Sequence, residues 1–207
     1  MGGKSFQILQ FSGLFFFLFF GILFQIKEIN CQSQNEEDSE FTQSLILDNP
    51  RGSYLLDQKI DWSAKRAVFN VTVKTTGFIG FGLSKNGEME GADIVIGGVA
   101  SNGEPYFTDR HGVRRGPPQV DKSQDWKLDQ SWEENGTTFL SFSRPLNTCD
   151  EENDVVIRGN EKVTLLWAFG ETDEVEIEPK VENSGTFETS FGGPNGMVEM
   201  GENDCKS

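Results

Sequence analysis

Apolar and polar residues alternate with a period of two along much of this chain. Within residues 67–74, for example, Phe69, Val71 and Val73 are separated by single polar residues. A β-strand places successive side chains on opposite faces, so this pattern predicts a strand with one buried and one solvated face. The same reasoning predicts strands over residues 54–62, 67–74, 78–83, 93–99, 105–110, 126–132, 138–143, 163–169, 175–177 and 186–191. About ten short strands separated by turn signals predict an all-β protein built as a β-sandwich.

Two glycine-punctuated apolar runs, residues 77–83 and 92–99, are joined by a polar connection that contains Met89. Together with four further segments, these runs resemble a DOMON domain, and most closely the amino-terminal module of the dopamine beta-monooxygenase-like copper enzymes. The further segments are residues 106–111 (YFTDRH), 123–126 (SQDW), 142–150 (FSRPLNTCD) and 163–170 (VTLLWAFG). The resemblance covers about residues 53–191 and implies an immunoglobulin-like β-sandwich.

The amino-terminal residues are typical of a targeting segment. Lys4 precedes a 14-residue apolar core at residues 11–24, which is shorter than the roughly 20 residues that a membrane span needs. We therefore expect a signal peptide at residues 1–31, cleaved after Cys31, and a secreted, extracellular protein without a membrane span. An uncleaved anchor over residues 6–26 is the alternative. Domain boundaries are expected as an acidic leader at 32–50, a DOMON domain at 51–191 and a flexible tail at 192–207.

The net charge of the chain narrows the classes of partner that it could bind. The chain carries 33 acidic and 18 basic residues, a formal net charge of −15 at pH 7. Such a surface repels nucleic acids and anionic membranes, and it favours solubility or contact with cations and basic partners.

The cysteines and asparagines fit secretion. After cleavage, Cys149 and Cys205 remain, an even pair in an oxidising compartment. They are expected to bridge within the chain, or Cys205 pairs with a second chain to give a disulfide-linked dimer. Asn70 and Asn135 each begin an Asn-X-Thr triplet and are expected to carry glycans, with Asn135 in an exposed hairpin turn.

The chain contains a single histidine, and this count limits its redox chemistry. Copper monooxygenation needs several His or Met ligands, so we expect no enzymatic activity. Some DOMON domains bind haem b between a Met and a His, and the resemblance places Met89 at the Met position. The family's His position, within residues 171–191, holds no His; only His111 is left as a substitute. We therefore expect no cofactor, with haem b on Met89 and His111 as the alternative.

Two kinds of binding site remain. Trp126 and Trp132 offer flat rings on which a sugar or small molecule could stack, and Asp125 or Gln124 beside Trp126 could supply hydrogen bonds. Calcium contact is the second option, although no EF-hand spacing is present and the acidic run 150–154 is typical of a solvated loop. Its candidate oxygen ligands are Asp93, Asp109, Asp121, Asp125 and Asp129.

The sequence thus predicts a non-catalytic extracellular module that binds an unidentified ligand or protein. Two alternatives stay open: a haem b-binding electron carrier, and an acidic matrix component that contacts calcium or mineral.

Overall fold

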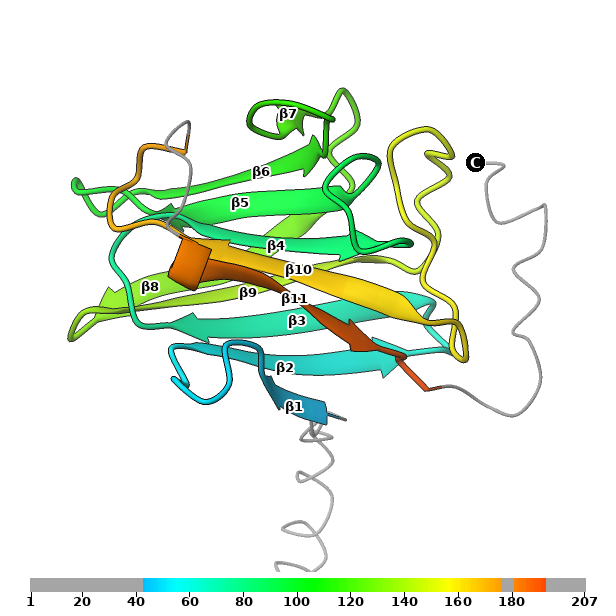
Figure 1. The fold of residues 1–207 in the computed structure, drawn as a ribbon, viewed down its shortest axis with the longest axis horizontal. Helices are drawn as coiled ribbons and strands as arrows, with labels where there is room; N and C mark the ends of the chain where they lie inside the picture. Colours follow the sequence, from blue (N-terminus) through cyan, green and yellow to red (C-terminus); the bar gives the residue numbers. More distant parts are fainter. Residues whose placement is uncertain (1–42, 176–180, 193–207) are drawn as a thin grey trace, which may run out of the picture. The chain divides into compact units, whose positions relative to one another are not determined.

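Two antiparallel sheets face each other in the computed structural model, which describes residues 43–175 and 181–192 (Figure 1). One sheet has the strand order β1-β2-β3-β9-β8, and the other has the order β11-β10-β4-β5-β6-β7. The elements are β1 Gln43–Ile46, β2 Tyr54–Asp61, β3 Arg66–Val73, β4 Ile79–Ser84, β5 Asp93–Val99, β6 Pro105–His111, β7 Gln119–Val120, β8 Lys127–Glu134, β9 Thr137–Pro145, β10 Val163–Phe169, the short 3₁₀ helix η1 Val181–Asn183, and β11 Ser184–Thr189. This architecture confirms the predicted all-β sandwich. No helix within these ranges is long and apolar enough to cross a membrane.

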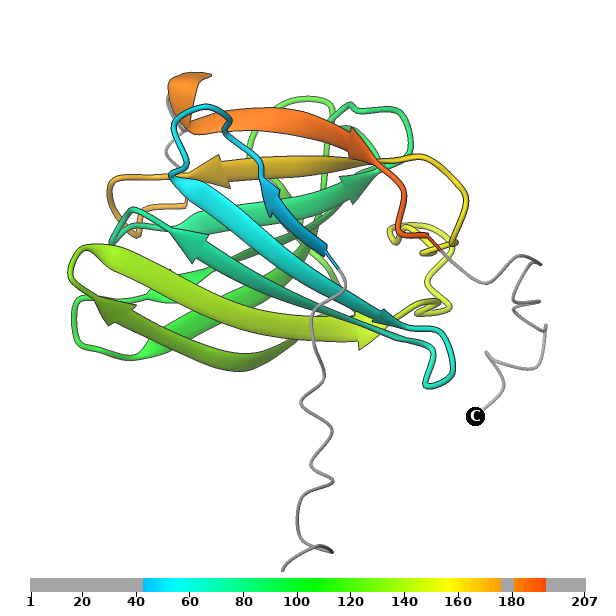
Figure 2. The same cartoon turned by 90° about the horizontal axis from the view of Figure 1, so that it is seen from below.

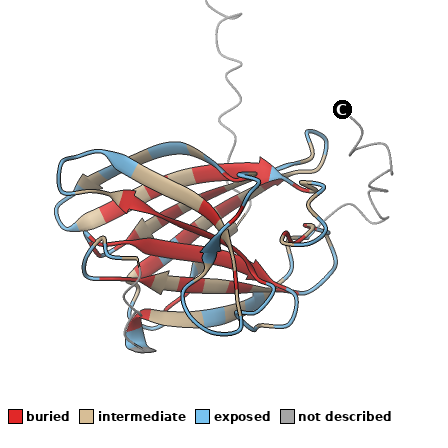
Figure 3. Cartoon of the chain, turned by 90° about the horizontal axis from the view of Figure 1, so that it is seen from above, coloured by how far each residue is buried: buried red, intermediate tan, exposed pale blue. Residues whose placement is uncertain are grey.

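The period-two pattern explains how the core forms. In β3, every second side chain is buried, and its neighbours β2 and β9 follow the same alternation. Figure 3 shows the buried positions concentrated on the strands. At the centre, the ring of Phe69 lies 5.1 Å from Phe81, 5.6 Å from Trp126 and 5.9 Å from Phe142, measured between centroids. Aromatic pairs at these distances dominate core energetics, so this cluster joins the two sheets.

The central strands of the six-stranded sheet are buried on both faces. β4 is buried throughout, and β5 is buried except at its last residue. Gly82 allows this close packing, because a Cβ atom there would lie 2.9 Å from Cγ1 of Ile94 and 3.0 Å from the carbonyl oxygen of Asp93. A second apolar cluster forms beside these strands from Phe78, Ala92, Ile94 and Ile96.

The observed strands differ from the predicted ones at the periphery. The prediction does not include β1 and β7. Both are short strands at the edges of their sheets, and they are recognised by their pairing with a neighbouring strand rather than by their own sequence pattern. Trp126 precedes β8 instead of starting it, and β11 begins two residues earlier than expected. Val175 lies in a turn, and the remainder of the predicted strand 175–177 falls outside the described residues.

Figure 2 shows the five-stranded sheet from another side, with β2, β3, β9 and β8 crossing the molecule together. Three connections of this sheet join consecutive antiparallel strands: β1 to β2, β2 to β3, and β8 to β9. At the end of the sandwich where β5 begins, β6 and β9 end. The loops that gather there bring together the residues of the site described next.

Candidate functional site

A buried ion pair lies at this end of the sandwich. Arg144, on β9, and Asp93, the first residue of β5, are 1% and 0% exposed, and the guanidinium Nη1 pairs with Oδ2 of Asp93. The indole Nε1 of Trp126 donates to Oδ1 of Asp93 at 2.6 Å, and the backbone N–H of Val155 donates to Oδ2 at 3.2 Å. The guanidinium carbon lies 5.0 Å from the centroid of the Trp126 ring. Both oxygens of Asp93 therefore have donors, which burial of a charge requires. Burial nevertheless raises the pKa of Asp93, against the lowering effect of Arg144 and Trp126.

Further carboxylates surround this pair and are not compensated in the same way. Carboxylate oxygens of Asp93, Asp109 and Asp154 lie within 4.8 Å of one another, as do those of Asp121, Asp150 and Asp154. We call these five aspartates the acidic site. Asp154 belongs to both groups, so the two groups share one residue.

Three oxygens of the acidic site are buried without a hydrogen-bond partner. They are Oδ1 of Asp109, Oδ2 of Asp121 and Oδ2 of Asp154. Their residues are only 1%, 6% and 6% exposed. Arg144 Nη2 lies 3.7 Å from Oδ2 of Asp154, too far for a hydrogen bond. Buried acceptors without donors are rare in folded proteins, and each one points to an ion, a water or a shared proton.

Loop residues hold these carboxylates in place. The side chain of Gln124 accepts from the backbone N–H of Asp109 and donates to its carbonyl oxygen, which docks the loop onto β6. Oδ2 of Asp109 then accepts the N–H of Asp125 at 2.8 Å. In the loop after β9, Asp150 accepts the N–H of Asn153, which folds the turn that leads to Asp154.

Burial, neighbouring charges and hydrogen bonds shift the pKa values of these aspartates. Burial is the main cause that raises the pKa of Asp109 to about 7, and the nearby charges of Asp93 and Asp154 act in the same direction. Burial likewise raises the pKa of Asp154 to about 6, with a contribution from Asp93. In contrast, the N–H group of Asn153 lowers the pKa of Asp150. Near neutral pH the acidic site is thus poised between proton binding and ionisation.

Four of the five predicted calcium ligands lie in or beside the acidic site. Asp93, Asp109 and Asp121 belong to it, and the charge of Asp125 contributes to the raised pKa of Asp154. Asp129 lies elsewhere: it is on β8, 3.7 Å from Arg66 and 3.4 Å from Lys127.

Sequence reasoning missed two central residues. Asp154 was grouped with a solvated loop, yet it is 6% exposed. Arg144 follows Leu140 and Phe142 at alternate positions of β9, all three of them buried. That period-two continuation was the available signal that Arg144 points into the core.

The two tryptophans singled out as stacking platforms have different environments. Trp126 is 4% exposed and packs against Phe69 and Phe142, so it has no ring face free for the predicted ligand. Trp132 is 45% exposed on β8, and its ring stacks on Phe139 with a centroid distance of 4.9 Å.

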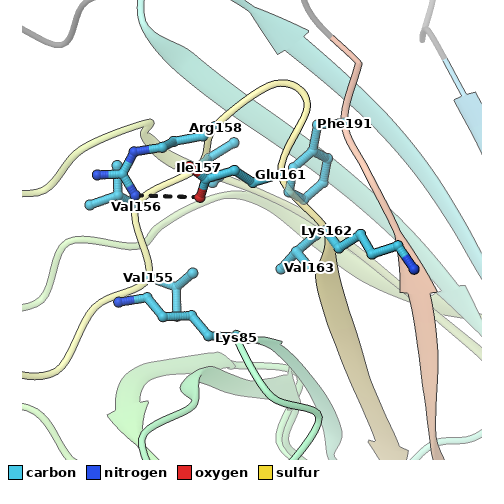
Figure 4. A pocket seen from close by; sticks show the side chains of 9 residues that line it. All are labelled: Lys85, Val155, Val156, Ile157, Arg158, Glu161, Lys162, Val163 and Phe191. Carbon is cyan, nitrogen blue, oxygen red and sulfur yellow. Dashed lines mark ion pairs between the residues drawn. The ribbon is translucent and has the colours of Figure 1, made fainter. Parts of the chain in front are cut away.

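Met89 and His111, the alternative haem ligands, lie in the loop before β5 and at the last residue of β6. Nδ1 of His111 lies 3.5 Å from Oδ2 of Asp121, so the imidazole faces the acidic site. Met89 lies in the loop before β5 and is 46% exposed. A pocket beside this end of the sandwich, lined by Lys85, Val155 and Phe191 among others, has a volume of only about 30 Å³ (Figure 4). That space suits about one water molecule.

Three of the four residues predicted to carry covalent modifications are among the residues that the structure describes. Asn135 has φ of 52° at the exposed tip between β8 and β9. Asn70 is half-buried on the outer face of β3, and its Oδ1 is buried without a hydrogen-bond partner. Cys149 lies in the loop after β9, whereas Cys205 lies outside the described residues, as does the predicted signal peptide. The Cys149–Cys205 bridge therefore stays a prediction.

Comparison with known proteins identifies relatives of this sandwich. The profile of the DOMON domain family matches residues 50–170. The chain is 38% identical to the mouse DBH-like monooxygenase protein 1 over 138 residues, 66% of this chain and 21% of the relative. Identity to the human DBH-like monooxygenase protein 1 is 37% over 141 residues, 67% of this chain and 22% of the relative. The chain thus spans about a fifth of the length of these relatives.

A solved structure shares the fold. The cytochrome b domain of pyranose dehydrogenase from Coprinopsis cinerea superposes with a TM-score of 0.51 at 14% sequence identity, covering 67% of this chain and 77% of that one. At this identity, the likeness concerns the arrangement of strands.

Replacing Arg144 tests the buried ion pair. We expect Arg144→Met to lower the free energy of unfolding by about 3–5 kcal/mol, because Asp93 would be left as an uncompensated buried charge. Urea unfolding at neutral pH measures this change. Arg158→Met is the matched control, since Arg158 is half-exposed and its pairing with Glu161 contributes at most about 1 kcal/mol. A loss for Arg144→Met no larger than that of the control would contradict the account.

The raised pKa values predict how stability changes with pH. An unfolded Asp has a pKa of about 3.9, so the folded protein retains the Asp109 proton at pH values where the unfolded chain has lost it. The resulting stabilisation is complete below pH 4 and is lost as pH rises through about 7. In chelator-treated buffer, the melting temperature of the wild type should therefore fall between pH 5 and 8.

Asp109→Asn isolates this effect. Asn cannot ionise, and its carbonyl oxygen can still accept the N–H of Asp125. The variant should show a weaker fall of melting temperature with pH than the wild type. Parallel curves for the two proteins would mean that Asp109 ionises at its ordinary pKa.

Proposed function

The chain belongs to the DOMON family, and from this membership and the acidic site we propose that it is a secreted, non-catalytic binding module that holds calcium. The observation that carries the proposal is the set of three buried carboxylate oxygens without donors, on Asp109, Asp121 and Asp154. Calcium takes six to eight oxygen ligands, carboxylates foremost. An ion in either of the two carboxylate groups that share Asp154 would supply positive charge to these oxygens.

The charge balance of the site supports a cation. Five aspartates gather around one permanent positive charge, the guanidinium of Arg144. Asp93 already uses both of its oxygens to accept from Arg144, Trp126 and Val155. The acids left to coordinate an ion are therefore Asp109 and Asp154 on one side, and Asp121 and Asp150 on the other. Because Asp154 belongs to both groups, either ion position would depend on it.

The proposed extracellular location matches this chemistry. It is supported by the signal-like amino-terminal sequence and by the two glycan acceptor triplets. Extracellular calcium modules typically bind with dissociation constants of about 10⁻⁴–10⁻³ M. A partly protonated carboxylate cluster in a rigid sandwich is consistent with an affinity in this weak range, because protons compete with the metal.

We propose that the module lacks the monooxygenase activity for which the relatives are named. The chain matches about a fifth of those proteins and has one histidine, whereas copper of the monooxygenase kind favours several imidazole ligands. The described residues hold no counterpart of such a ligand set, since His111 faces Asp121.

A haem b carrier is the alternative from a different class. The chain shares the strand arrangement of a cytochrome b domain, but the imidazole of His111 lies beside the carboxylate of Asp121. We expect the purified protein, incubated with haemin, to show no sharp Soret and α bands of a six-coordinate haem. A visible absorption spectrum measures this, and a Soret band that Met89→Ala or His111→Ala abolishes would replace our proposal with the carrier.

Calcium titration tests the proposed function directly. Isothermal calorimetry with the full secreted chain at pH 7.5 should detect saturable calcium binding, accompanied by a rise in melting temperature. Asp154→Asn should weaken calcium binding about tenfold or more, because it removes a charged ligand from both groups.

Asp57→Asn is the matched control for this titration. Asp57 lies on β2, where its carboxylate accepts from Ser44, and its replacement removes the same charge without touching the acidic site. The control should bind calcium like the wild type. If the wild type gives neither heat nor thermal stabilisation at about 5 mM calcium, above the expected dissociation constants, calcium is not its ligand.

A further inference from the structure

An apolar row crosses the outer face of the five-stranded sheet. The strand register pairs Ile46 with Leu55, Leu55 with Thr72, Thr72 with Phe139, and Phe139 with Trp132. We call these five residues the outer row. Three of them are large apolar side chains with substantial exposure: Ile46 at 47%, Leu55 at 38% and Trp132 at 45%. Trp132 and Phe139 stack with their ring planes 8° from parallel.

The other half of the same face is charged. Arg66 and Lys127 form ion pairs with Asp129 at 3.7 Å and 3.4 Å. Ser143 lies among them, as a hydrogen-bond donor to Asp129. Asn70 stands between the two halves, two residues before Thr72 on β3 and paired with Ser141 of β9. The face therefore changes from charged to apolar at the position of Asn70.

Asn70 and Thr72 form an N-glycan acceptor triplet whose two polar side chains share this face. Phe139 is the diagonal neighbour of Asn70 on β9, at a Cα distance of about 7–8 Å. Trp132 is one strand further, about 5 Å more. Both aromatic residues thus lie within about 12–13 Å of Asn70 on the same face, measured between Cα atoms.

We propose that the glycan on Asn70 lies back over the outer row, with its first N-acetylglucosamine against Phe139 and Trp132. Sugar rings carry apolar C–H faces that pack on aromatic rings. Stacking covers one face of Trp132 and one face of Phe139, so the surface offered to a sugar is an outer ring face and the edges of the pair. The row supplies this surface on one side of Asn70 only. On the other side, the ion pairs of Arg66 and Lys127 favour water.

This arrangement would also cover an exposed sheet margin. β8 is the edge strand of its sheet, and Trp132 lies on it. Exposed edge strands with large apolar side chains promote pairing with other chains. A glycan held against Trp132 shields both the ring and the edge, so Trp132 would serve the protein's own sugar rather than an external ligand.

The inference rests on the extracellular location proposed above and is independent of calcium. Fluorescence tests it, because the chain has four tryptophans, two of which, Trp126 and Trp167, are buried at 4% and 7% exposure. Acrylamide quenching therefore reports largely on Trp132 and Trp62. The protein would be the full chain secreted from glycosylating eukaryotic cells, with occupancy of Asn70 and Asn135 measured by mass spectrometry of glycopeptides.

We expect Asn70 to be occupied and Asn70→Gln to raise the acrylamide quenching constant about twofold, as the indole becomes exposed. Asn135→Gln is the matched control and should leave the constant unchanged. In a Trp132→Phe background, the Asn70 substitution should have no effect on quenching.

Enzymatic trimming provides the same test without a substitution that could impair folding. Cleavage of the folded glycoprotein to a single N-acetylglucosamine should preserve the low quenching constant, and complete removal of the glycan should raise it. Equal quenching before and after complete removal would overturn the inference. So would a rise caused by Asn135→Gln instead of Asn70→Gln, or shielding of Trp132 that depends on protein concentration, which would indicate a second copy as the occupant.

Occupancy separates this inference from the proposed location. Sugar on Asn135 with Asn70 empty would overturn the inference alone. Absence of sugar at both positions would overturn the inference and contradict passage through the secretory route as well.

Discussion

The pairing of Arg144 with Asp93 is the interaction on which the organisation of the sandwich end depends. Arg144 is on β9 of one sheet and Asp93 is on β5 of the other, so their contact crosses the interior. Trp126 completes the link, because its indole donates to Asp93 while its ring lies under the guanidinium. Burying two charges costs several kcal/mol per ion unless nearly every donor and acceptor is used. Here Asp93 accepts from three groups, which makes the pair tolerable and fixes where β5 begins relative to β9.

That constraint has an electrostatic consequence for the neighbouring acids. A single guanidinium compensates Asp93 well, but it lies 3.7 Å from Asp154 and leaves an oxygen there without a donor. Burial, together with the charges of Asp93 and Asp154, raises the pKa of Asp109 to about 7. The fold that buries the Arg144–Asp93 pair thus also buries neighbouring carboxylates of the acidic site in a low-dielectric environment. A proton or a metal ion can supply the missing charge, and the two compete.

Local sequence patterns predicted most of the fold, because each strand buries one face and alternation records that burial. β5 and β10 have the predicted limits, and β3 and β9 differ from theirs by a few residues at most. The site was less accessible to such reasoning. Asp109, Asp121 and Asp154 come from one strand and two separate loops, and only the sheet order brings them to one end. Asp154 in particular belongs to an acidic run that, by composition, is indistinguishable from a solvated turn.

The two surfaces that carry the functional proposals are physically separate, and this has consequences for how the module works. The acidic site lies between the sheets, where β5 and β9 meet, whereas the outer row lies on the solvent face of the five-stranded sheet. The strand common to both is β9, which carries Arg144 beside the acidic site and Phe139 in the outer row. Changes at distant sites without shared partners usually add. A cation that stiffens the sandwich end and a glycan that covers a flat face therefore act on different weaknesses of the same small domain: surplus buried charge in one case and exposed apolar surface in the other.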